Sequence, residues 1–275
     1  PGVRPVLIAF LVIALQWPDT ALPHCLAEGF DLGGDIDPCG VARPIAAKRF
    51  GHSADAPAEG EELFGRDAER LLDELESKTD LGPNTQRIWD MTRQEIAEGR
   101  AGPLMDRQDL LHRFGWGMCR PLPRHVIEQN ADWLAIDDGR RAHTNRLSTS
   151  EEALVHIPAS ILIVCFRALV ARCVRDYGSQ PWWCQLTTGV EDWWKGYRQL
   201  FPSRRHAGLN VAAVLDPVKR VWCYALLWGV AFGLGTAVDQ FNRVPALLTA
   251  VARRVGYLLA DHYVDDNAIS ELLCL

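Results

Sequence analysis

Two adjacent carboxylates, Asp265 and Asp266, lie in the stretch LLADHYVDDNAIS near the end of the chain, between two short apolar runs. Adjacent like charges repel, and one of them tends to lose its charge unless a cation compensates. Asp and Asn are good turn residues, so a solvated turn is the simplest interpretation of the pair. A metal site is the sharper interpretation, and it needs at least one more carboxylate from elsewhere in the chain.

Asp192 is the candidate for that carboxylate, because it ends a predicted strand, WWCQLTTGVED. If this strand and the hairpin at Asp265 are neighbours in one sheet, three carboxylates converge at one edge. Three oxygen-rich groups suit Mg²⁺, which shares its ligands with phosphates. Two such ions a few ångströms apart can activate an attacking hydroxyl group and stabilise a leaving pyrophosphate.

The elements that must position these residues occupy the last hundred residues. The pattern there predicts a strand at 182–192 with a helical turn after it, a hairpin at 209–227, a helix at 236–256 that Pro245 kinks, and a hairpin around Asp265. This order predicts an α+β fold in which a sheet is backed by helices on one face.

The rest of the chain is predicted to be mostly helical. The apolar run VLIAFLVIAL is too short to span a bilayer, which takes about 20 residues, and we expect a buried helix there. Further helices are expected where apolar residues recur at helical spacing, and a hairpin is expected where two apolar runs flank a polar turn. We expect a loop at 29–44, helices within 61–99 and 105–115, a hairpin within 119–145 and a helix at 151–177.

Composition excludes few classes of protein. The chain has 275 residues, of which 48% are hydrophobic and 23% charged, as in an ordinary globular protein. Its eight cysteines form no CxxC pair, so we expect free thiols in a reducing, intracellular compartment, cytoplasmic or nuclear. The net charge of −6 argues weakly against a stand-alone nucleic-acid binder, although a local basic patch can lie in an acidic chain.

Three motifs occur together in an order that resembles a known family. They are DWWKGY (Asp192–Tyr197), AFGLGTAVDQFNR (Ala231–Arg243) and YVDD (Tyr263–Asp266). In order and rough spacing they resemble the motifs of reverse transcriptases, and the chain resembles the fingers and palm of a retroelement enzyme from about Gly29 onward. Upstream, RPLPRHVIEQ and AIDDGRRAHTN resemble that family's fingers hairpin, and GFDLGGDIDPCG resembles its pre-fingers region.

The resemblance implies an RNA-directed DNA polymerase that transfers nucleotides to a primer 3′-hydroxyl by a two-metal mechanism. It makes Asp192 and Asp265 the main ligands of two Mg²⁺ or Mn²⁺ ions, with Asp266 as a third acid. Tyr197 matches the aromatic residue that lies under the incoming sugar and obstructs a 2′-hydroxyl.

The resemblance also implies a nucleotide pocket and contacts to nucleic acid. Phe232 and Gly233 match positions that line the pocket, where a glycine lets the backbone approach the ligand. Arg124 and Arg140 lie in the matching fingers region, where we expect them to contact template or phosphates. The implied partners are an RNA or DNA template with primer, deoxynucleoside triphosphates and a downstream thumb region of the same polypeptide, with no membrane.

The fold implied is a fragment of a polymerase right hand. We expect a helical N-terminal, pre-fingers region at 1–115, fingers at 116–180 and a palm at 181–275 with a ferredoxin-like sheet backed by helices. The thumb is absent from this range.

Some residues depart from the family pattern. Asp132 and Leu134 occupy fingers positions where related sequences usually carry basic residues, and Ala231 replaces a common proline. These departures favour an alternative, a decayed copy that keeps the fold and binds nucleic acid without catalysis. An RNA-templated RNA polymerase is a third alternative, and the aromatic residue at Tyr197 disfavours it. Tyr197 and Phe232 also have a plainer interpretation as core aromatics.

Overall fold

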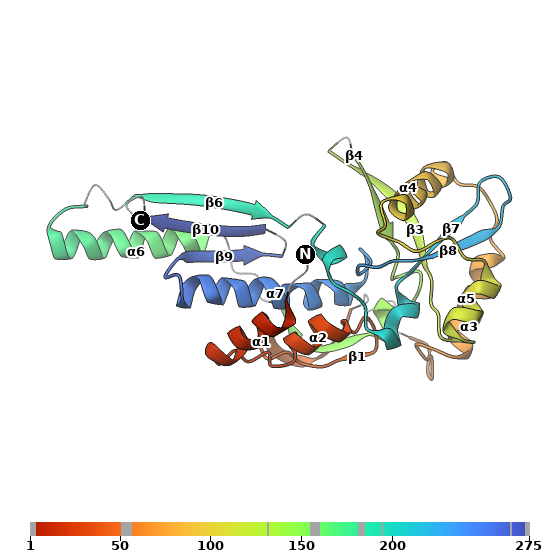
Figure 1. Cartoon of the computed structure of the whole chain (residues 1–275), viewed down its shortest axis with the longest axis horizontal. Helices are drawn as coiled ribbons and strands as arrows, with labels where there is room; N and C mark the ends of the chain where they lie inside the picture. Colours follow the sequence, from red (N-terminus) through yellow and green to blue (C-terminus); the bar gives the residue numbers. More distant parts are fainter. Residues whose placement is uncertain are drawn as a thin grey trace.

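A computed structural model of the chain describes residues 4–50, 57–130, 132–154, 160–180, 185–193, 195–264 and 266–272. It has a mixed α+β fold with three small sheets (Figure 1). The α+β class predicted from the sequence is therefore confirmed. No described helix is both long enough and apolar enough to cross a membrane.

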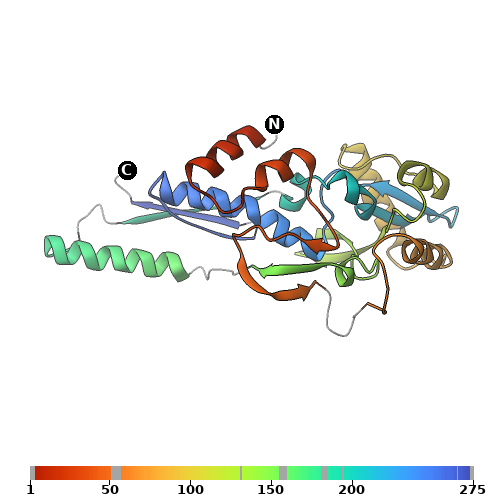
Figure 2. The same ribbon diagram turned by 90° about the horizontal axis from the view of Figure 1, so that it is seen from below.

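One sheet contains the strand that ends at Asp192 and the C-terminal hairpin. Its order is β6 (Leu186–Asp192), β10 (Asp266–Leu272), β9 (Leu259–Tyr263), and both pairings are antiparallel. Two helices, α6 (Ser160–Tyr177) and α7 (Gly235–Arg254), run alongside it and contact β9 (Figures 1 and 2). The predicted strand, helix and final hairpin all form, and the expectation that helices cover one face of this sheet stays a prediction.

The second sheet has the order β4 (Asp132–Asp137), β3 (Leu122–Gln129), β7 (Val211–Leu215), β8 (Trp222–Leu226). Both predicted hairpins, β3–β4 and β7–β8, are present, and a parallel pairing of β3 with β7 joins them. Strands from the range expected to form the fingers (116–180) and from the range expected to form the palm (181–275) therefore share one sheet.

Three amphipathic helices cover this second sheet. Helices α3 (Arg66–Glu76), α4 (Thr85–Ala97) and α5 (Arg107–Phe114) form where the apolar spacing predicts them. Helix α5 begins at a capping box, in which the Asp106 side chain accepts from the backbone N–H of Asp109, and it ends at Gly115. Leu72, Leu75 and Leu110 pack from these helices against Val211 and Tyr224 of the sheet.

The third sheet corrects two expectations about secondary structure. Its order is β1 (Asp35–Ile36), β5 (Thr149–Ala153), β2 (Arg43–Arg49). The loop expected at 29–44 contains strand residues, and the helix expected from residue 151 begins only at Ser160.

The N-terminal helices α1 (Pro5–Ala14) and α2 (Leu22–Glu28) pack together beside α7 (Figure 2). The helix predicted for the apolar run is confirmed, but only its Ile8 and Val12 side chains are buried, and Val6 and Ile13 are more than three-quarters exposed. The main hydrophobic core joins this region to Leu22, Phe30 and Leu32 and to one face of α7 through Phe241, Val244 and Leu247.

Candidate functional site

The pairing of β6 with β10 brings two of the three predicted carboxylates together. Asp192, the last residue of β6, lies directly opposite Asp266, the first residue of β10. Directly opposite residues in an antiparallel pair point to the same face, with Cβ atoms about 4.5–5.5 Å apart. Both side chains are exposed, and neither has a hydrogen-bond or ion-pair partner among the described residues. Two carboxylates so placed repel each other, and this arrangement favours a cation between them.

The turn before Asp266 fixes the end of β10. Val264 joins β9 to this turn and has a φ of +55°, a conformation that is unusual for a β-branched residue. Its side chain is partly buried against the main core, which holds the turn in place. Residues kept in such strained conformations cluster at functional sites, where the surrounding structure over-determines them.

Asp265, the third predicted carboxylate, lies outside the described residues. Among the residues that the structure does describe, no group of three or more His, Cys, Asp or Glu side chains is arranged to hold a metal ion. The opposed pair of Asp192 and Asp266 is therefore the part of the predicted metal site that the structure describes. Carboxylate oxygens are the ligands that Mg²⁺ and Mn²⁺ take, so these two residues fit the expected ions chemically.

Tyr197 and Phe232, two residues of the predicted nucleotide pocket, lie next to each other. Tyr197 lies on the short 3₁₀-helix η3 (Gly196–Gln199) that follows β6, and its ring meets Phe232 edge-on with centroids 5.5 Å apart. The ring of Tyr197 also packs against the ring of Phe241 on α7, and the two ring centroids are 5.1 Å apart. The plainer interpretation of Tyr197 as a packing residue thus holds for part of its ring, while Phe232 remains 38% exposed.

Gly233 is needed for the approach of the Phe232 segment to the β3–β4 hairpin. Its φ is +125°, and a Cβ atom added there would lie 2.2 Å from the carbonyl oxygen of Asp137. The backbone N–H of Asp137 donates to the carbonyl of Phe232 at 2.8 Å. The close approach of this glycine in the structure is to strand β4, and its predicted approach to a nucleotide stays a prediction.

Arg124 lies in the interior and does not reach solvent, as a direct contact to template or phosphates would require. Its side chain is fully buried on β3, where Nε donates to Asp137 at 2.8 Å and Nη1 donates to Glu95 at 2.7 Å. Burial by itself lowers the pKa of Arg124, but the charges of Asp137 and Glu95 outweigh burial and raise it. Arg124 is therefore a structural cation that ties the β3–β4 hairpin to helix α4.

Sequence reasoning gave no role to Arg198 or Asp137, the other members of this ionic cluster. Arg198 follows Tyr197 on η3, and its Nη2 donates to the second carboxylate oxygen of Asp137 at 2.8 Å. The Asp137 side chain is fully buried between the two arginines. The network connects the loop that carries Tyr197 to the β3–β4 hairpin. The only signal for this network in the sequence is the presence of opposite charges among apolar residues.

Arg140 lies in the turn after β4 and is exposed. The carboxylate of Asp138 accepts from the backbone N–H groups of Arg140 and Arg141 at 3.0 and 2.9 Å, which orders this turn. The exposed position suits the predicted contact with phosphates. Asp132 and Leu134, where basic residues were expected, are both exposed on β4.

No family model and no curated protein matches this chain. The geometry therefore stands alone as support for a function. It consists of an exposed carboxylate pair at the end of one sheet, and of an aromatic pair whose Tyr197 closely follows Asp192 in the chain and which a buried ionic network attaches to a second sheet.

Proposed function

We propose that the chain is the catalytic part of an RNA-directed DNA polymerase of a retroelement, which adds deoxynucleotides to a primer 3′-hydroxyl. The observation that carries the proposal is the register that sets Asp192 directly opposite Asp266. Two uncompensated carboxylates on neighbouring strands make a site for a hard divalent cation. The three-stranded sheet with α6 and α7 beside it is compatible with a ferredoxin-like palm.

In this proposal Asp192, Asp265 and Asp266 hold two Mg²⁺ or Mn²⁺ ions. When bound, such ions activate the attacking hydroxyl group and stabilise the leaving pyrophosphate. Asp192 and Asp266 supply negative charge at the sheet edge and determine where the primer end and the triphosphate meet. A close, fixed placement of reactants can contribute roughly 7–11 kcal/mol to lowering the barrier.

Tyr197 and Phe232 then form the floor of the nucleotide site. The contact of Tyr197 with Phe232 and Phe241 limits its ring to one position, which a steric test of the sugar requires. Gly233 keeps the backbone of this segment against β4. Arg140, exposed at the end of the fingers hairpin, is placed to contact phosphates of the template or the nucleotide, and a thumb elsewhere in the polypeptide is the expected clamp on the duplex.

A second function is favoured by one observation on the fingers hairpin. Asp132 and Leu134 are exposed on β4, so a triphosphate or template there meets a negative charge and an apolar side chain. A decayed copy that retains the fold and binds nucleic acid without catalysis would tolerate these residues. The two candidates differ in catalysis and agree in nucleic-acid binding.

Primer extension tests the proposal. The chain, alone and within a longer polypeptide that includes the expected thumb, is given an RNA template, a DNA primer, deoxynucleotides and Mg²⁺. We expect Asp192→Asn and Asp266→Asn to reduce extension by at least about 100-fold, because electrostatic stabilisation is usually the largest catalytic contribution. The control is Asp80→Asn, which removes an exposed carboxylate from the α3–α4 loop and should leave extension unchanged.

Two results would contradict the proposal. Extension that persists in Asp192→Asn would show that the opposed pair is not the catalytic site. Template binding without extension by the longer polypeptide would favour the decayed copy instead.

A further inference from the structure

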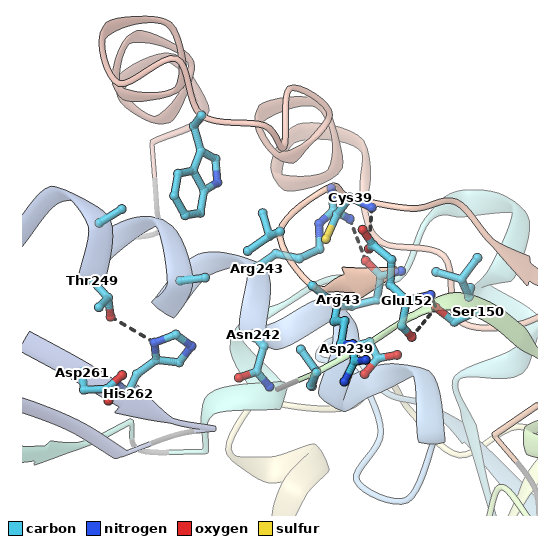
Figure 3. Close-up of a pocket in the computed structure, with 18 of the residues that line it drawn as sticks. Cys39, Arg43, Ser150, Glu152, Asp239, Asn242, Arg243, Thr249, Asp261 and His262 are labelled. Carbon is cyan, nitrogen blue, oxygen red and sulfur yellow. Dashed lines mark hydrogen bonds between the residues drawn. The ribbon is translucent and has the colours of Figure 1, made fainter. Parts of the chain in front are cut away.

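A cavity of about 500 Å³ lies along helix α7, away from the candidate polymerase site (Figure 3). Its walls come from α7, strands β5 and β9, Trp17 and the segment 36–43. None of Asp192, Tyr197, Phe232 or Asp266 lines it. The volume falls in the range of small-molecule sites, about 300–1,000 Å³. Much of the wall is apolar, formed by Trp17, Ile36, Val41, Leu154, Ala246 and Ala250.

Asp261 presents an unsatisfied acceptor at one end of this cavity. Its side chain, on β9, belongs to a residue that is only 6% exposed. Oδ1 accepts from the backbone N–H of His262 at 2.8 Å and lies 3.4 Å from an Arg253 nitrogen. Oδ2 is buried and has no hydrogen-bond partner among the described residues. A buried acceptor without a donor is costly and rare in native proteins, so Oδ2 calls for a donor from a ligand.

A second acceptor, Asp239, lies near the other end of the cavity. It is half-buried on the first turns of α7 and has no hydrogen-bond or ion-pair partner in the described part of the chain. Burial, together with the nearby charge of Glu152, raises the pKa of Asp239 to about 6, and the charge of Lys48, which is not bonded to Asp239, opposes this rise only in part. Glu152 itself accepts from the backbone N–H groups of Cys39 and Gly40, both at 2.7 Å.

The arginines in the cavity wall have other partners. Arg243 makes two hydrogen bonds to Asp19, at 2.7 and 2.8 Å. Arg253 Nε donates to the carbonyl of Ala260, and Arg254 donates to the carbonyl of Leu15. Arg43 is exposed, and its charge is therefore screened by solvent and salt. None of these cations is bonded to Asp239 or to Oδ2 of Asp261.

The two acceptors are far apart along α7. His262, next to Asp261, contacts Thr249 at 3.0 Å, and Thr249 lies ten residues after Asp239 on the same helix. At a rise of 1.5 Å per residue, this separation is about 15 Å. The cavity is thus an elongated channel with an apolar wall and a carboxylate near each end, and a ligand that satisfies both must be long and doubly charged.

We propose that this channel binds a long, linear aliphatic diamine. Its terminal ammonium groups donate to Oδ2 of Asp261 and to the carboxylate of Asp239, and its methylene chain lies against the apolar wall. Charge-assisted hydrogen bonds to ammonium groups are about twice as strong as neutral ones. The required length distinguishes this ligand from short amines, which reach one end only.

Calorimetric titration of the intact chain with 1,12-diaminododecane tests the proposal, in a buffer without metal, template or nucleotide. The result is therefore independent of the proposed polymerase activity. Because the chain is acidic, non-specific attraction must be separated from binding in the channel. Asp239→Asn, Asp261→Asn and Asp80→Asn each remove one negative charge, but only the first two remove an acceptor from the channel.

We expect Asp239→Asn and Asp261→Asn to weaken binding of 1,12-diaminododecane about tenfold or more and Asp80→Asn to leave it within about twofold. 1,3-Diaminopropane, which has the same charge and is shorter, should bind at least about tenfold more weakly. Ala246→Leu, which narrows the channel without changing charge, should also weaken binding and serves as the test if Asp261→Asn does not fold. Equal effects of the three Asn variants, or equal binding of the short diamine, would overturn the proposal.

Discussion

Tyr197 is the residue at which the proposed function makes its most specific chemical prediction. Its ring lies between Phe232 and Phe241, close after Asp192 in the chain. If the ring obstructs a 2′-hydroxyl, Tyr197→Ala should raise the use of ribonucleotides relative to deoxynucleotides by roughly 10–100-fold in single-nucleotide primer extension. Tyr197→Phe keeps the bulk and should change discrimination little. The same discrimination in Tyr197→Ala and in the parent would refute the role.

Gly233 shows how one residue sets the distance between two segments. We expect Gly233→Ala to lower the free energy of unfolding by about 2–3 kcal/mol, because its Cβ would collide with the Asp137 carbonyl oxygen. Gly99→Ala is the matched control, since Gly99 has a φ of +71° with no atom within 4 Å of an added Cβ. Its cost should be about 1 kcal/mol. Urea unfolding measures both, and equal losses would show that the close approach to β4 is unimportant.

Asp239 makes stability depend on pH in a direction that can be worked out. Its pKa in the folded chain, about 6, lies above the value of about 3.9 expected in an unfolded chain. As the pH falls from 6 toward 4, the folded state therefore binds the proton before the unfolded state does. The contribution of Asp239 to the free energy of unfolding rises in that pH window. This contribution is lost again as the pH increases through 6.

Asp239→Asn removes the ionised form at every pH. We expect it to raise the unfolding free energy by about 1 kcal/mol at pH 7.5, a value discounted for partial exposure, and to give no gain near pH 4. Chemical unfolding at the two pH values measures the difference between variant and parent. A gain of the same size at both pH values would contradict the raised pKa.

At the scale of elements, the buried ionic network joins three pieces of the chain. Arg124 of β3 and Arg198 of η3 share the carboxylate of Asp137 at the end of β4, and Glu95 of α4 adds a second acid. Without the Asp137 carboxylate, Arg124 and Arg198 share Glu95 as their acidic partner. Buried charge that is not compensated lowers the free energy of unfolding.

We therefore expect Asp137→Asn to lower the unfolding free energy by about 3 kcal/mol or more. The neighbouring Asp138→Asn should change it by less than about 0.5 kcal/mol, because an amide oxygen can still accept from the backbone of the turn. Denaturant unfolding of the two variants distinguishes them. Similar losses would mean that the buried network contributes nothing beyond an ordinary turn.

The sequence predicts elements well where the apolar spacing is local and strong. Helix α7, with Phe241, Val244 and Leu247 on one face, and the β7–β8 hairpin around Asp216 both form as expected. The strands β2 and β5 were missed because they are short, largely polar and paired across about a hundred residues. Their formation depends on tertiary pairing, which a local pattern does not contain.

The candidate site shows the same limit. Motif order predicted that Asp192 and Asp266 would meet, but only sheet pairing gives the register that sets them opposite each other. Arg124 was expected to contact template or phosphates because it lies in the region that resembles the fingers, and that resemblance does not reveal its partners within the chain. Its burial depends on Asp137 and Glu95, and the contact with Glu95 comes from a helix distant in sequence.

At the scale of the whole molecule, three small sheets and two hydrophobic clusters together position the residues of the candidate site. Tyr197 follows strand β6, which ends at Asp192, and its ring contacts Phe232, while the backbone of Phe232 and Gly233 meets β4 of the second sheet. In the proposed function, a cation held by Asp192 and Asp266 would lie near this aromatic pair. This arrangement of the two sheets around one cation site is the central claim.

Binding of Mn²⁺ to the intact chain tests that claim most directly, because it needs neither template nor thumb. Free Mn²⁺ is measured by electron paramagnetic resonance during titration of the parent and of Asp192→Asn, Asp266→Asn and Asp80→Asn. We predict that the first two variants lose affinity by about tenfold or more, since each removes a direct ligand, and that Asp80→Asn binds as the parent does. Equal Mn²⁺ affinity in the parent and in Asp192→Asn would contradict the account.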